Sequence, residues 1–198
     1  MSVNLGDLKQ LRKATGAGML DCKNALDESD GDMQKAITIL REKGIKVASK
    51  KASRDADEGL IVSYIHPPGK LGVMVEINCE TDFVAMTEDF RKFAKQIAMH
   101  IAAYPPVVVS REDLPEEAVE AEKKVLIAQL EDSGKPAEII EKIVDGRMEK
   151  FYLETCLLDQ EWSDDPELGT VKDALTDLIG KLRENIVIRR FARFSIGN

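Results

Sequence analysis

The stretch LIVSYIHPPGKLGVMVEIN (Leu60–Asn78) decides the fold that this sequence predicts. Apolar and polar residues alternate before and after Pro67-Pro68-Gly69, and β-branched residues are frequent on both sides. Alternation with a period of two is typical of strands that bury one face, and a short turn of Pro and Gly joins antiparallel neighbours. We therefore expect an antiparallel β-hairpin, with strands over residues 60–65 and 73–78.

Two helices and a last strand surround this hairpin in the predicted core. Over residues 88–103, apolar residues recur every three or four positions, which predicts an amphipathic helix that packs on a sheet. Residues 171–182 show the same helical pattern. Residues 186–196 alternate again, so we expect a final strand that joins the sheet of the hairpin.

Two long, charged helices are predicted between these elements. The first follows Pro115 and runs to about residue 132, Ser133-Gly134 breaks it, and Pro136 begins the second. Because the connection is short, we expect an antiparallel helical hairpin that either projects or lies on the core. The short β-branched stretch Val107–Val109 is a candidate strand.

The beginning of the chain predicts a module of three short helices. Asn4 is a suitable cap for the first helix, Gly16 and Gly18 separate it from the second, and Gly44 is expected to end the third. Three helices in so few residues bury only a small core. We therefore expect some apolar residues of this module to stay at the surface.

Charge and composition place a boundary near residue 57. Residues 1–57 contain 11 Lys or Arg and 9 Asp or Glu, whereas the remaining residues contain 17 and 27. The stretch 46–57 is polar and rich in small residues, which is typical of a linker. The predicted organisation is a three-helix module (1–45), a linker (46–57) and an α+β core (58–198).

The composition excludes several classes of protein. The chain has 198 residues, 43% of them apolar, and a formal charge of −8, which disfavours a coat for nucleic acid because phosphate binding needs a cationic surface. Its three cysteines form no CxxC pair, which indicates free thiols of a reducing compartment. No apolar run reaches the roughly 18 residues that a membrane span needs. We expect a soluble cytoplasmic protein without a membrane partner.

Few residues have the spacing that catalysis requires. Gly16-Ala17-Gly18 lacks the third glycine and the preceding strand of a dinucleotide-binding loop, so a turn between helices is the better interpretation. His66 and His100 lack metal-ligand spacing, and the sequence assigns no role to them or to Lys50 and Lys51.

One acidic group leaves an alternative open. Glu76, Glu80 and Asp82 could lie on one face of a strand and bind Mg²⁺, although a solvated strand face is the more common outcome. A Mg²⁺-dependent hydrolase is therefore one alternative function. A helical-hairpin adaptor that binds a partner without changing it is another.

The segment NCETDFV (Asn78–Val84) is unusual because a strong strand runs into polar residues and then Phe83. An exposed aromatic side chain beside an acid at a rigid strand end is typical of an anchor for a partner. Judged by these residues alone, a buried Phe83 is still the more common outcome.

Two stretches resemble the signatures of one family, translation elongation factor Ts. They are LRKATGAGMLDCKNAL (Leu11–Leu26) and EINCETDFVA (Glu76–Ala85). Three further stretches are similar and follow the family's order along nearly the whole chain, namely Ala94–Ala103, Ser133–Gln160 and Glu184–Phe194. Met86 departs from the family's usual basic or polar residue, and we expect it to tune the contact there.

The resemblance implies a guanine-nucleotide exchange factor for elongation factor Tu, active in translation elongation. It implies that the N-terminal module resembles ubiquitin-associated domains and docks on the partner's GTP-binding domain through apolar residues. By match, those residues are Leu11, Met19 and Leu20. The family's segment that intrudes near the partner's Mg²⁺ is matched by Thr81, Asp82, Phe83 and Val84. The resemblance thus implies an exposed Phe83.

Such a factor makes no bond, so we expect no catalytic residue, metal or cofactor of its own. Longer relatives carry two related core halves and this chain has one, which implies a homodimer that supplies the second half. The expected partner is a protein, without direct binding of nucleic acid.

Overall fold

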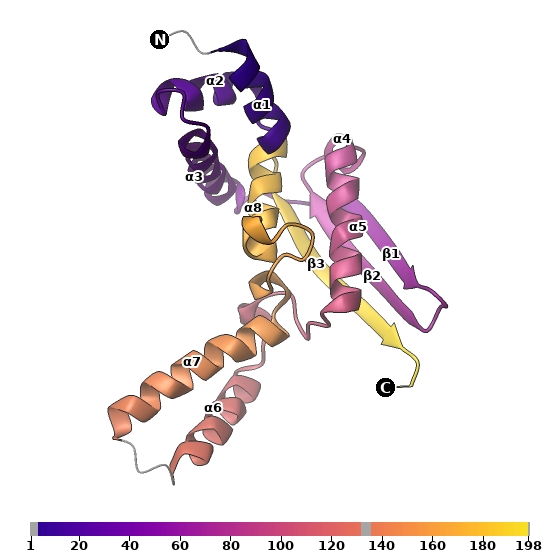
Figure 1. Cartoon of the computed structure of the whole chain (residues 1–198). Helices are drawn as coiled ribbons and strands as arrows, with labels where there is room; N and C mark the ends of the chain where they lie inside the picture. Colours follow the sequence, from indigo (N-terminus) through magenta and orange to yellow (C-terminus); the bar gives the residue numbers. More distant parts are fainter. Residues whose placement is uncertain (1–3, 132–135, 198) are drawn as a thin grey trace. The chain divides into compact units, whose positions relative to one another are not determined.

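The computed structural model describes residues 4–131 and 136–197, and it is a mixed α+β fold as predicted (Figure 1). The predicted helix break at Ser133-Gly134 lies outside the described residues. By its contacts the chain divides into two compact units. Unit 1 comprises the described part of Met1–Leu60 together with Ile77–Lys92 and Asp173–Val187, and unit 2 comprises the rest.

The sheet contains the predicted hairpin and the predicted last strand. Strands β1 (Glu58–His66), β2 (Leu71–Cys79) and β3 (Ile186–Ser195) lie in the order β1-β2-β3, so β2 is central. The alternating residues Val73, Val75 and Ile77 of β2 are buried. The hairpin and the joining of the last strand are therefore confirmed.

The helices predicted at residues 88–103 and 171–182 are also confirmed, as α5 (Glu88–Ala103) and α8 (Val171–Leu182). Their apolar residues recur at helical spacing and are buried, for example Phe93, Ile97 and Ile101 in α5. Periodic burial of this kind is the strongest secondary-structure signal in a sequence.

Unit 1 begins with three helices, α1 (Leu5–Thr15), α2 (Met19–Glu28) and α3 (Met33–Lys51). The Asn4 side chain accepts a hydrogen bond from the backbone N–H of Gly6 at 2.9 Å, as expected of a cap. The core of the three helices is small, and its buried residues are Leu8, Leu11, Cys22, Ala25, Leu26 and Ala36. The limits of the module and the linker at residues 45 and 57 stay a prediction.

The prediction that Gly44 ends the third helix is wrong, because α3 continues through it to Lys51. Gly44 serves a close approach between helices instead. A Cβ atom added to Gly180 of α8 would lie 2.9 Å from the Cα atom of Gly44. The two glycines thus allow the backbones of α3 and α8 to meet within unit 1.

The structure of unit 2 includes the helical hairpin, formed by α6 (Glu116–Glu131) and α7 (Ala137–Thr155). Its buried seam consists of Leu126, Leu130, Val144 and Met148. The predicted strand at Val107–Val109 is reduced to a single bridge between Val108 and Cys156. Short 3₁₀ turns occur at Arg111–Asp113, Leu157–Asp159 and Pro166–Leu168.

Arg111 fixes the base of this hairpin. Its guanidinium donates to both carboxylate oxygens of Glu149 at 3.0 and 2.8 Å and lies 2.7 Å from Asp159. It also stacks 4.3 Å from the centre of the Tyr152 ring. A two-pronged ion pair of this kind fixes direction as well as distance.

We predict that Gly180→Ala destabilises the protein, whereas Gly146→Ala in α7 stabilises it. The methyl group at position 180 would force α3 and α8 apart, at a cost of about 1–3 kcal/mol. Among the described residues, no atom lies within 4 Å of a Cβ placed at Gly146, so that change gains about 0.5–1 kcal/mol of helix propensity. Guanidinium unfolding measures the free energy of unfolding of each variant. Equal changes in this free energy for the two variants would contradict the close approach of α3 and α8.

Candidate functional site

The segment that follows β2 folds into a one-turn helix, α4 (Asp82–Ala85). Thr81 has extended backbone angles and caps this helix, since its hydroxyl oxygen accepts a hydrogen bond from the N–H of Val84 at 3.4 Å. Ala85 is buried and anchors the other end. The strand therefore delivers α4 at a defined position in unit 1.

Phe83 lies on α4 with 79% of its surface exposed, and Met86, directly after α4, is 62% exposed. A phenyl ring this exposed contributes nothing to a core, so the common outcome of a buried Phe83 does not hold. Large apolar side chains presented on a rigid element are typical of binding anchors.

Every polar group of Thr81 is engaged within unit 1. Its N–H and its hydroxyl donate to the two carboxylate oxygens of Glu184, at 3.0 and 2.7 Å. Its carbonyl oxygen accepts from the thiol of Cys79 at 3.1 Å. Burial, assisted by the charge of Glu184, raises the pKa of the Cys79 thiol to about 11, so the thiol keeps the proton that it donates.

Glu80 lies beside this arrangement and binds the chain that carries Glu184. It accepts from the N–H of Asn185 at 2.7 Å and from the guanidinium of Arg54 at 3.1 Å, and Lys51 is 3.7 Å away. The Asn185 N–H, followed by Arg54 and Lys51, lowers the pKa of the Glu80 carboxyl. Lys51 thus has a structural partner, whereas Lys50 is exposed.

Glu184 and Asn185 are not among the site residues that the sequence predicts. Thr81 and Glu184 are separated by 103 positions, and no local pattern connects them. The only signal in the sequence is that Glu184 and Asn185 lie immediately before the predicted last strand, in a stretch that resembles the family.

The predicted docking residues divide into two groups. Met19 and Leu20, at the start of α2, are 48% and 69% exposed. Leu11 is fully buried between the helices of the module, so the expectation that it remains at the surface is wrong. The physical reason is the size of the core, which needs Leu11 to fill its centre.

The stretch Gly16-Ala17-Gly18 is the turn between α1 and α2, as interpreted from the sequence. Gly16 has a φ of 65° and closes α1, a conformation that favours glycine. Lys181 of α8 packs directly over it and makes an ion pair with Asp89 at 2.8 Å. These contacts fix the start of α2, where Met19 and Leu20 lie.

The three carboxylates of the hydrolase alternative have other partners or face solvent. Glu76 binds Arg190 at 2.7 Å, Glu80 binds Asn185, and Asp82 is exposed. Within residues 4–131 and 136–197, no three acidic, histidine or cysteine side chains form a group that could hold a metal. The contacts favour structural roles for Glu76 and Glu80.

Of the two histidines, His100 is buried and His66 is exposed next to Tyr64. His100 Nε2 donates to the amide oxygen of Gln160 at 3.0 Å, and Nδ1 accepts from the Ser163 hydroxyl at 2.9 Å. The ring stacks on Trp162. Burial lowers the pKa of His100, so the neutral ring holds the loop after α7 to α5 within unit 2.

Comparison with known proteins gives one consistent result. The sequence model of the family described as "Elongation factor TS" matches residues 9–169. The chain belongs to the elongation factor Ts family. It is 61% identical over 190 residues to elongation factor Ts of Caldanaerobacter subterraneus subsp. tengcongensis, which covers 96% of this chain and 94% of that protein.

Two further relatives match over their full lengths. They are elongation factor Ts of Fervidobacterium nodosum, 52% identical over 197 residues, and that of Herpetosiphon aurantiacus, 54% identical over 198 residues, each covering 100% of both chains. The predicted family membership is confirmed. In the part of the chain that the structure describes, no helix is long and apolar enough to cross a membrane.

We predict that unit 2 loses stability in mild acid through His100. The pKa of His100 in the folded protein lies below the ordinary value of 6.5. The stability that the neutral ring contributes is therefore complete above about pH 6.5 and is lost as the pH falls below that value. His100→Gln should weaken the fall in unfolding midpoint between about pH 7 and pH 5. His66→Gln is the matched control, and an unchanged pH profile in His100→Gln would contradict the assignment.

Proposed function

We infer that this protein promotes guanine-nucleotide exchange on elongation factor Tu during translation elongation, in the cytoplasm. The single observation that supports a site for this role is the exposed Phe83 on α4, held at the end of a central strand. Membership of the elongation factor Ts family supports elongation factor Tu as the partner.

The exchange can be explained by thermodynamic reciprocity. GDP is held in a GTPase by phosphate contacts and by Mg²⁺, whose charge offsets that of the phosphates. A protein that binds the nucleotide-free GTPase more tightly than the GDP form weakens GDP binding by the same factor. The factor needs no general acid, base or metal of its own, because no bond is made or broken.

Thr81, Asp82, Phe83 and Val84 form the exchange segment in this proposal. Phe83 enters between elements of the partner beside its Mg²⁺ site and shifts them. Asp82, exposed next to it, competes for donors or for a helix N-terminus that would otherwise face phosphate. Thr81 and Val84 stabilise the single turn of α4 through the hydrogen bond between them.

Met19 and Leu20 form the docking surface on the partner's GTP-binding domain. Both side chains are exposed at the start of α2. Leu11 supports them from within the module core and makes no direct contact in this proposal. Docking there supplies affinity, and the exchange segment converts part of that affinity into displacement of the nucleotide.

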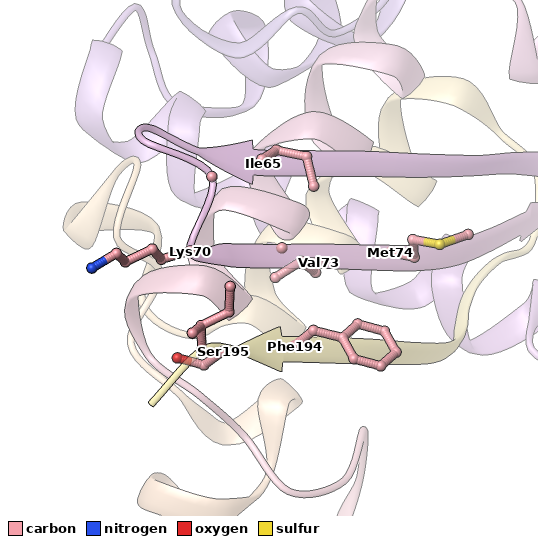
Figure 2. Close-up of a pocket in the computed structure, with 9 residues that line it drawn as sticks. Ile65, Lys70, Val73, Met74, Phe194 and Ser195 are labelled. Atoms are coloured by element: carbon pink, nitrogen blue, oxygen red, sulfur yellow. The ribbon is translucent and has the colours of Figure 1, made fainter. Parts of the chain in front are cut away.

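We also propose a homodimer that forms through the open face of the sheet in unit 2. Exposed apolar residues gather on this face, and they are Ile61, Ile65, Met74, Phe194 and Ile196. Figure 2 shows Ile65, Met74 and Phe194 among the residues that line a hollow on the sheet. The volume of this hollow is about 450 Å³. An apolar surface of this kind is a typical protein interface, and a second copy covers it symmetrically.

The exchange role predicts that Phe83→Ala slows GDP release from elongation factor Tu about tenfold or more, as expected when a central aromatic anchor is lost. The fold should be retained, because the ring is exposed. Stopped-flow release of fluorescent GDP measures the rate. Val107→Ala, which shortens another exposed apolar side chain, is the control.

An unchanged release rate in Phe83→Ala would exclude the proposed insertion of Phe83 between elements of the partner. Binding of elongation factor Tu by the wild-type protein without faster GDP release would favour the adaptor alternative instead. Hydrolysis of a substrate by this protein alone would favour the Mg²⁺-dependent hydrolase.

The dimer predicts that Phe194→Glu gives a monomer. A charge in an apolar interface has no partner, and its desolvation weakens association by several kcal/mol, on the order of a thousandfold. Analytical ultracentrifugation measures the mass of the variant. Ile139→Glu, on the exposed side of α7, should leave the mass unchanged, and a monomeric wild type would contradict the dimer.

A further inference from the structure

We propose that Glu184 is a positioning residue for nucleotide exchange: its carboxylate fixes Thr81 and thereby the direction in which α4 presents Phe83. The proposal rests on the exchange function inferred above and assigns a role to a residue outside the exchange segment. Glu184 lies in the short connection between α8 and β3, which belongs to unit 1 together with α4.

One carboxylate controls both the backbone and the side chain of Thr81. The Thr81 hydroxyl has a single proton and donates it to Glu184 at 2.7 Å. Its oxygen lone pairs then face the N–H of Val84, which is how Thr81 caps α4. Without Glu184 the hydroxyl can rotate and the N–H of Thr81 loses its acceptor, so the first turn of α4 loses its defined start.

The contact is reciprocal, which makes it a clasp between two chain segments. The side chain of Glu184 holds the N–H of Thr81 at 3.0 Å, and the side chain of Glu80 holds the N–H of Asn185 at 2.7 Å. Asn185 is buried and also donates to the carbonyl oxygen of Arg54 at 2.7 Å. Because each segment supplies both a carboxylate and a backbone donor, neither can shift alone.

The backbone next to Glu184 supports a functional constraint. Arg183 has a φ of 63°, a left-handed conformation that residues other than glycine rarely adopt. Such a conformation persists where surrounding contacts over-determine it. Here the Arg183 N–H donates to the carbonyl oxygen of Ile179 at 2.8 Å and so closes α8. The Arg183 side chain pairs with Asp21 of α2 at 2.6 Å. These two contacts hold Arg183 while the next residue, Glu184, binds Thr81.

The clasp also reaches the docking module. Lys51, the last residue of α3, and Arg54 both contact Glu80. The same network thus connects the helix that builds the module with the turn that carries Phe83. A four-residue helix has no stability of its own, so its orientation depends on these contacts.

The proposal separates docking from exchange in a kinetic experiment. GDP release from elongation factor Tu loaded with fluorescent GDP is measured over a range of factor concentrations. Glu184→Ala should lower the maximal rate about tenfold and change the half-saturating concentration by less than about twofold. Glu28→Ala, which removes the ion pair of Glu28 with Lys43 in the module, is the matched control and should keep both values.

A conservative variant tests whether geometry is the cause. In Glu184→Gln the amide oxygen can accept from the Thr81 N–H and the amide NH₂ can donate to the hydroxyl oxygen. We therefore expect recovery to within about threefold of the wild-type maximal rate. A tenfold loss in Glu184→Gln equal to that in Glu184→Ala would overturn the positioning role.

A double-mutant cycle tests whether Glu184 acts through Phe83. In the Phe83→Ala background, Glu184→Ala should cause no further loss, because there is no ring left to orient. The same tenfold loss in both backgrounds would overturn the proposal, as would an unchanged rate in Glu184→Ala. If the wild-type protein does not accelerate GDP release from elongation factor Tu, the exchange function fails. If Phe83→Ala accelerates release as much as the wild type does, the role of Phe83 fails; both outcomes are independent of Glu184.

A second pair of variants applies if Glu184→Ala does not fold, which its circular dichroism would reveal. Thr81→Val replaces the hydroxyl by a methyl group of similar size, and Thr81→Ser keeps the hydroxyl. Thr81→Val should lower the maximal rate, whereas Thr81→Ser should stay within about twofold of the wild type. Equal rates for these two variants would overturn the proposal.

Discussion

The central position of β2 is the constraint on which the rest of the structure depends. Both other strands pair with β2, and its inward residues Val73, Val75 and Ile77 are buried. A shift by one residue would move these side chains to the opposite face, so the register is strongly determined. The point at which β2 ends is then fixed as well, and with it the place where Thr81 begins α4.

The second constraint is the small size of the α1–α3 core. A module of about 45 residues cannot bury every apolar side chain that it contains. Leu8 and Leu11 fill its centre, whereas Met19 and Leu20 remain outside. A core of minimal size therefore leaves an apolar surface at the start of α2, which is the property that a docking module needs.

The sequence was sufficient to predict elements whose signal is periodic and local. Helices at residues 88–103 and 171–182 and the hairpin around Pro67-Pro68-Gly69 are as predicted, because burial repeats at the spacing of the element. The prediction at Gly44 is wrong because a glycine that ends a helix and one that allows a second helix to approach look the same in one sequence. The contact between Thr81 and Glu184 could not be predicted, because only the fold brings positions 103 residues apart together.

The clasp also explains how a segment of four residues can transmit binding free energy. An exchange segment on a flexible loop would become ordered only on docking. The conformational entropy lost at that step would reduce the free energy that couples binding to nucleotide release. Here the ordering takes place during folding, because Glu184, Cys79 and the N–H of Val84 already satisfy the polar groups of Thr81. Phe83 is 79% exposed, while the backbone of the turn that carries it is held by the hydrogen bonds of Thr81. In the proposed exchange role, the carboxylates that stabilise the turn would determine how much of the docking affinity acts on the nucleotide.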